Sequence, residues 1–61
     1  MSFQIGDLVI INSSAKVWVE DDIGIIEKAY TSDFFYVRVL KHDDVFLLKH
    51  DEFELYKLIE D

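Results

Sequence analysis

Residues 34–40 read Phe-Phe-Tyr-Val-Arg-Val-Leu, and this stretch decides the fold. Aromatic and β-branched side chains fill it, and both types are enriched in strands. Four other short apolar runs share this character: residues 8–11, 23–26, 45–48 and 53–59. Runs this short, bounded by turn residues, are typical of strands rather than helices. We therefore predict an all-β fold, a five-stranded small barrel formed by a single domain over residues 1–61.

Two details refine this fold. Gly24 lies inside the second run, where a glycine indicates a bulge or a close approach of another backbone. The long loop over residues 12–22 contains the apolar triplet Val17-Trp18-Val19, which needs a partner to pack on.

The last run is ambiguous. Asp51 and Glu54 have the spacing of a helix capping box, and Leu55, Leu58 and Ile59 would share one face of a helix. An isolated helix of this length is marginal, however, and a curled sheet has an edge that a fifth strand would cover. We expect a single-turn helix over residues 50–53 and then a strand. The alternative is four strands followed by a short C-terminal helix.

Composition narrows the class of protein. The chain contains no cysteine, so it has neither disulfides nor a thiolate metal site, and a reducing compartment is favoured. No apolar run approaches the roughly 18 residues of a membrane span, and residues 1–4 carry no basic signal region. We predict a cytoplasmic protein that does not contact membranes. The surplus of isoleucine, aspartate and lysine is typical of a small accessory protein from an A/T-rich bacterial or phage genome.

The charge is strongly acidic, with 13 acidic residues against 6 basic ones and a formal net charge of −7. Such a field repels phosphate, so direct binding to nucleic acid is disfavoured. The acids gather at residues 20–22 and in the last third of the chain. They serve either solubility or docking of a positively charged partner.

Strand alternation assigns the faces of the sheet. If Val9, Ile11, Phe35, Val37 and Val39 face the core, their neighbours point outward. Together with Trp18 from the loop, the outward residues form a candidate apolar patch with acids at its rim, a composition expected of a protein contact. The candidate partner-binding residues are Leu8, Ile10, Trp18, Asp21, Asp22, Phe34 and Tyr36. The alternative is that the loop folds back over these residues, or that a bulge changes the alternation.

Catalytic and metal sites are not indicated. His42 and His50, with nearby aspartates, carry the atoms of a metal site, but they follow different strands and are expected to lie apart. Ser13, Ser14 and Ser32 lie in polar turn segments, with no histidine and acid in register. We therefore expect no enzyme activity, no cofactor and no bound metal.

Several motifs together resemble those of a known class. They are Gly6-Asp7-x-Val9-x-Ile11, Trp18 in the following loop, Ile23-Gly24-x-Ile26, Tyr36-Val37-x-Val39 and Asp51-Glu52-Phe53-Glu54-Leu55. In order and spacing this set resembles the SH3-like small barrels, especially photosystem I reaction-centre subunit IV and the variable chain of ferredoxin:thioredoxin reductase. The resemblance implies a five-stranded barrel in which Gly24 allows a sharp strand bend.

These observations lead to two functional hypotheses. The first is a non-catalytic interaction module or accessory subunit that binds a protein partner, or a second copy of itself, through an apolar face with acids at its rim. The second is an acidic regulator or inhibitor that occupies the nucleic-acid-binding surface of a host or viral protein. Salt separates the two, because screening weakens charge-driven binding much more than apolar binding.

Overall fold

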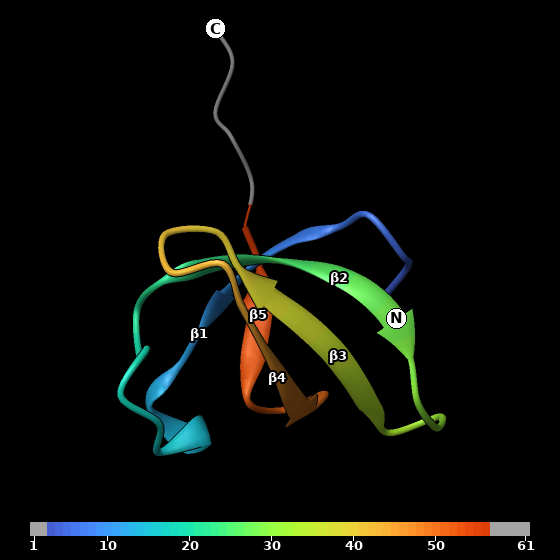
Figure 1. Cartoon of the computed structure of the whole chain (residues 1–61). Coiled ribbons are helices and arrows are strands. Elements are labelled where there is room, and N and C mark those ends of the chain that lie inside the picture. Colours follow the sequence, from blue (N-terminus) through green and yellow to red (C-terminus); the bar gives the residue numbers. More distant parts are fainter. Residues whose placement is uncertain (1–2, 57–61) are drawn as a thin grey trace, which may run out of the picture.

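The computed structural model describes residues 3–56, which form one antiparallel sheet (Figure 1). Its strands are β1 (Leu8–Ile11), β2 (Ile23–Ala29), β3 (Phe34–Val39), β4 (Asp44–Lys49) and β5 (Phe53–Leu55). A short 3-10 helix, η1 (Ser13–Ala15), is the one helical element within residues 3–56. No helix in this part of the chain is long and apolar enough to cross a membrane. The predicted all-β fold with five strands is confirmed.

The strand order is β4-β3-β2-β1-β5, so β4 and β5 are the two edges of the sheet. β2 curves strongly, as Figure 1 shows, and this curvature wraps the sheet around its core. The sheet does not close, because β4 pairs with β3 and β5 pairs with β1. The barrel expected from the sequence is therefore an open, curled sheet, and no strand within residues 3–56 pairs with the free edge of β4.

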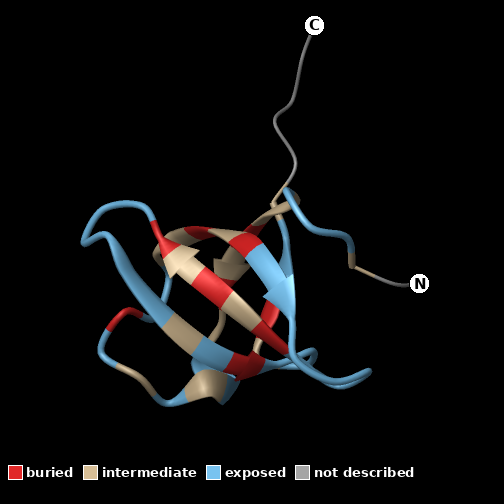
Figure 2. Ribbon diagram, turned by 45° about the vertical axis from the view of Figure 1, so that its right-hand side comes forward, coloured by how far each residue is buried: buried red, intermediate tan, exposed pale blue. Residues whose placement is uncertain are grey.

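The core follows the alternation read from the sequence. Along β3, buried residues alternate with partly exposed ones, as the bands of colour in Figure 2 show. The same pattern holds in β1. The buried side chains of the core are Val9, Ile11, Val19, Ile26, Phe35, Val37, Val39, Leu48 and Phe53. The predicted orientation of β1 and β3 is confirmed.

Gly24 marks a close approach of two strands rather than a bulge. It is buried and pairs with Val39, and the register shift in β2 lies farther on, between Ile26 and Lys28. A Cβ atom at this position would lie 2.6 Å from Val37 Cγ1 and 2.9 Å from the Arg38 carbonyl oxygen. Only glycine fits this part of β2 without displacing β3.

The long loop packs against the core through Val17 and Val19 of its apolar triplet. Val19 is fully buried in the core, whereas Trp18 next to it is exposed. The Asn12 side chain holds the start of the loop, because it accepts a hydrogen bond from the Ser14 amide and donates one to the Asp51 carbonyl, at 2.8 and 3.0 Å. These bonds join the loop to the turn between β4 and β5.

The single-turn helix expected at residues 50–53 is wrong. Residues 50–52 form a tight turn in which the Glu52 amide donates to the Lys49 carbonyl at 2.8 Å. Phe53 then begins β5, because its ring is buried and packs edge-on against Phe3 and Phe35. Residues 53–55 are thus strand, and the helical alternative is wrong there. Leu58 and Ile59, which that alternative invoked, lie outside the described residues.

Candidate functional site

The outer face of β3 and β4 carries a group of apolar side chains that are exposed or, for Tyr36, partly exposed. Tyr36 pairs with Leu47 across the two strands, and Tyr36 points away from the core because its neighbours Phe35 and Val37 are buried. Tyr30 packs edge-on against Tyr36, with ring centroids 5.7 Å apart. Leu47 and Tyr30 are 45% and 60% exposed. We call this group the outer patch, and its members are Tyr30, Phe34, Tyr36, Val45 and Leu47.

Two of the predicted contact residues, Phe34 and Tyr36, belong to the outer patch. Tyr30, Val45 and Leu47 were missed by the sequence analysis. Residues 45–48 are apolar throughout, so the sequence does not distinguish inward from outward positions there. The signal that identifies Val45 and Leu47 is their pairing with Arg38 and Tyr36, which requires the β3–β4 register.

Leu8 and Ile10 lie on the same outer face but in another area. They are half-buried and pair with Ile25 and Ile23 of β2. The structure therefore places them over β1 and β2, apart from the outer patch.

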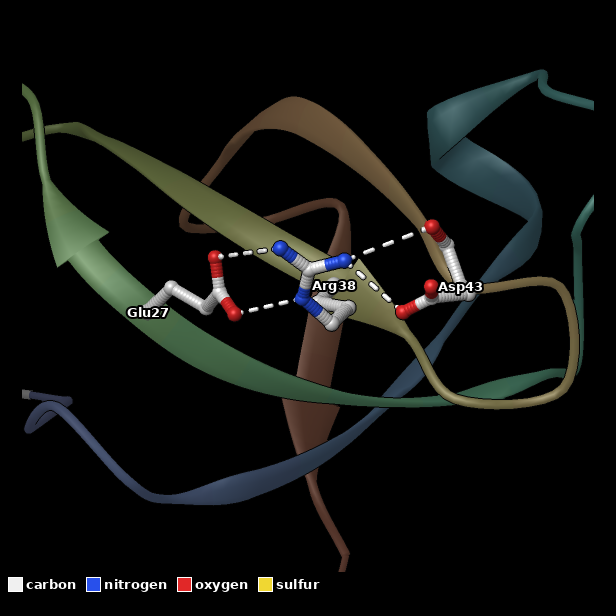
Figure 3. Close-up of polar contacts among 3 residues, drawn as sticks. All are labelled: Glu27, Arg38 and Asp43. Carbon is white, nitrogen blue, oxygen red and sulfur yellow. Dashed lines mark hydrogen bonds and ion pairs between the residues drawn. The ribbon is translucent and has the colours of Figure 1, made fainter.

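An ion-pair network separates these two apolar areas (Figure 3). Arg38 lies between Ile25 of β2 and Val45 of β4 in the sheet register. Its guanidinium bonds to Glu27 on one side and to Asp43 on the other, the latter with Nη1 2.8 Å from Oδ1. The hydrogen bonds to Glu27 and then to Asp43 raise the pKa of Arg38, so the cation is stabilised.

Trp18 lies on the opposite side of β4 from the outer patch. Its ring packs edge-on against His42 and Phe46, with centroids 4.7 and 6.0 Å away. Phe46 pairs with the buried Val37 and packs against the core, so its side chain is on the core side of β4. The indole is nevertheless 67% exposed. The structure does not bring Trp18 together with Phe34 and Tyr36.

Of the two predicted acids, Asp22 lies near Trp18 rather than in the outer patch. Asp22 Oδ2 lies 3.4 Å from Nε2 of His42, whose ring contacts Trp18. Asp21 has a left-handed backbone, with φ of 72°, and its amide donates to the Ile11 carbonyl at 2.7 Å. The candidate residues therefore form separate groups, one of them on the core side of β4 beside Trp18.

The histidines lie in different turns. His42 faces Asp22, and Nε2 of His50 lies 3.8 Å from Asp33 in the turn between β2 and β3. Within residues 3–56, no group of three or more His, Cys, Asp or Glu residues is arranged to hold a metal ion.

Comparisons with protein-family models, curated proteins and solved structures find no match to this chain. The resemblance to the SH3-like barrels stays a prediction, and the functional interpretation depends on the site itself.

Proposed function

We propose that this protein is a non-catalytic interaction module that binds a protein partner through the outer patch. One observation carries the proposal: aromatic and aliphatic side chains gather on the outer face of β3 and β4, where no other element of residues 3–56 covers them. Exposed apolar groups of this kind, with tyrosine among them, are characteristic of protein contacts. We place the module in the cytoplasm, since a chain without cysteine suits a reducing compartment.

The surroundings of the patch favour a selective contact. Asp33 precedes Phe34, and Asp43 lies in the turn before β4, so carboxylates lie at both ends of the β3–β4 hairpin. An apolar centre with a charged rim lets the centre supply affinity while the rim excludes partners of the wrong charge.

Quantitative capture tests the proposal. The tagged full chain is used to isolate a partner from its native host, and the affinity of that partner is then compared among variants by calorimetry. Tyr36→Ala is expected to weaken binding by about 2 kcal/mol, or roughly thirtyfold, as truncation of a central aromatic residue does. Leu55→Ala on β5, at the other edge of the sheet, is the control and should leave the affinity unchanged. Equal affinities of Tyr36→Ala and the wild type would refute the proposal.

A second candidate is an acidic regulator that occupies a nucleic-acid-binding surface. The net charge of −7, with Asp22 beside the His42 ring that contacts the exposed Trp18, favours it. Its affinity should fall by orders of magnitude between about 50 and 500 mM salt, because it depends on long-range charge. Binding through the outer patch should lose less than about tenfold over the same range.

A further inference from the structure

The free edge of β4 lies between the outer patch and Trp18. The His50 amide donates to the Asp33 carbonyl at 2.8 Å, which makes this a hydrogen-bonded pair of the β3–β4 ladder. In an antiparallel ladder, such pairs alternate with pairs whose backbone groups point away from each other. The N–H and C=O groups of Val45, Leu47 and Lys49 therefore point to the free edge.

One end of this edge is already occupied. The Lys49 amide donates to the Glu52 carboxylate at 2.9 Å, and the Lys49 carbonyl accepts from the Glu52 amide. The outward groups of Val45 and Leu47 receive no such bond from any residue between 3 and 56. Edge strands with exposed backbone groups and apolar side chains are templates for pairing with another strand.

We propose that β4 receives an extended segment of the partner protein as a sixth strand, and that basic and apolar side chains alternate along this segment. The inference rests on the proposed function and adds the mode of binding and the chemistry of the partner. Successive side chains of a strand point to opposite faces, so a segment on this edge would present one set to each side of β4.

The two sides of β4 differ in character, and this difference defines the segment. On the outer side, Val45 and Leu47 offer aliphatic surface next to Tyr36, which suits apolar side chains. On the core side, the exposed indole of Trp18 contacts the ring of His42, which lies beside the Asp22 carboxylate. Asp44 pairs with the buried Val39, so its carboxylate is on the same side of β4. An ammonium or guanidinium group is attracted both to an indole face and to carboxylates.

Charge also selects the occupant. A second copy of this chain would bring a further −7 to the interface, whereas a basic segment is attracted by the same field. The added strand would also join surfaces that the fold keeps apart, because its two sets of side chains reach Trp18 and the outer patch at once. Glu52 limits the available edge to the stretch around Val45 and Leu47, so a short segment suffices.

Amide hydrogen exchange tests the inference without altering the protein. The probe is the synthetic peptide acetyl-KVKVKVK-amide, added to the full chain labelled with ¹⁵N. At saturation, exchange of the Val45 and Leu47 amides should slow by about tenfold or more, as it does for amides that gain a strand partner. The Ser32 amide, in the β2–β3 turn, is the control and should not change. The acidic peptide acetyl-EVEVEVE-amide should give no protection.

A pair of variants adds an independent test. Leu47→Pro removes an outward N–H but none of the bonds to β3, and proline is tolerated at such edge positions. It should abolish peptide binding, whereas Leu47→Ala, which keeps the N–H, should retain measurable binding. Circular dichroism checks that both variants are folded. If either variant is unfolded, the exchange experiment on the wild type still tests the inference.

Several results would overturn the inference. They are unchanged Val45 and Leu47 exchange at saturating basic peptide, equal protection by the acidic peptide, and protection that grows with protein concentration alone, which would mean that a second copy occupies the edge. If binding of the captured partner depends on Tyr36 while the Val45 and Leu47 amides still exchange freely, strand addition is wrong and the proposed function stands. If the amides are protected but Tyr36→Ala leaves the affinity of that partner unchanged, the proposed role of the outer patch is wrong.

Discussion

Replacing Gly24 by alanine should destabilise the fold through a single steric conflict. The added Cβ would lie 2.6 Å from Val37 Cγ1 and 2.9 Å from the Arg38 carbonyl oxygen, both closer than van der Waals contact allows. The carbonyl belongs to the β3 backbone, so rotation of a side chain does not relieve the conflict. Overpacking of this kind costs about 1 to 3 kcal/mol.

This cost is large for so small a domain. At about 0.05 to 0.15 kcal/mol per residue, 61 residues correspond to roughly 3 to 9 kcal/mol of total stability. A loss of about 2 kcal/mol lowers the melting temperature by roughly 8 to 16 °C in a domain of this size. Urea unfolding measures the loss in the free energy of unfolding and thermal melting measures the change in melting temperature, both followed by circular dichroism.

A double-mutant cycle identifies the cause. Val37→Ala removes the Cγ1 atom that the new methyl group would strike, so the double variant should be more stable than the sum of the two single losses implies, by about 0.5 kcal/mol or more. Gly24→Ala with a loss below about 0.5 kcal/mol, or strict additivity with Val37→Ala, would refute the claim that β2 and β3 touch at this glycine.

Three further predictions concern the core, the surface and the loop. Phe53→Ala should cost about 3 to 5 kcal/mol, because a buried ring that contacts Phe3 is lost, and a thermal melt within a few degrees of the wild type would contradict this. Arg38→Gln should lower the melting temperature slightly at low salt and not at high salt, because salt screens the ion pairs of Arg38, and equal effects at low and high salt would contradict this prediction. Because the pKa of Arg38 is raised, the stabilisation from its ion pairs is present throughout the neutral range and is lost only in strong alkali. Asn12→Ala should cost about 1 kcal/mol in urea unfolding, because it leaves the Ser14 amide and the Asp51 carbonyl without this partner, and an unchanged midpoint would show that the loop is held by other contacts.

Local pattern accounts for the part of the fold that the sequence predicted correctly. Alternation placed Val9, Ile11 and Val37 in the core because each strand has one apolar face to bury. Gly24 indicated either a bulge or a close approach, because a strand position without a side chain leaves room for a neighbouring backbone, and the second of these is what the structure contains.

What the sequence did not predict depends on contacts between distant segments. Trp18 was grouped with Tyr36 because the loop was expected to add it to the outward-facing residues of the strands, but the loop brings Trp18 to Phe46 on the other side of β4. Residues 50–53 were predicted to form a single-turn helix, but they form a turn and the start of β5, because Phe53 is buried against Phe3 from the opposite end of the chain. Tertiary packing overrides local preference in both cases.

Chemical-shift mapping of the ¹⁵N-labelled chain with its captured partner tests the central claim most directly, namely that this protein acts by contact through the β3–β4 face. We predict that the perturbed amide signals concentrate in residues 34–36 and 45–49, while the chemical shifts of the β5 amides and of the Leu8 and Ile10 amides do not change. Perturbations centred on β1 and β5, with residues 34–36 and 45–49 unaffected, would contradict the account.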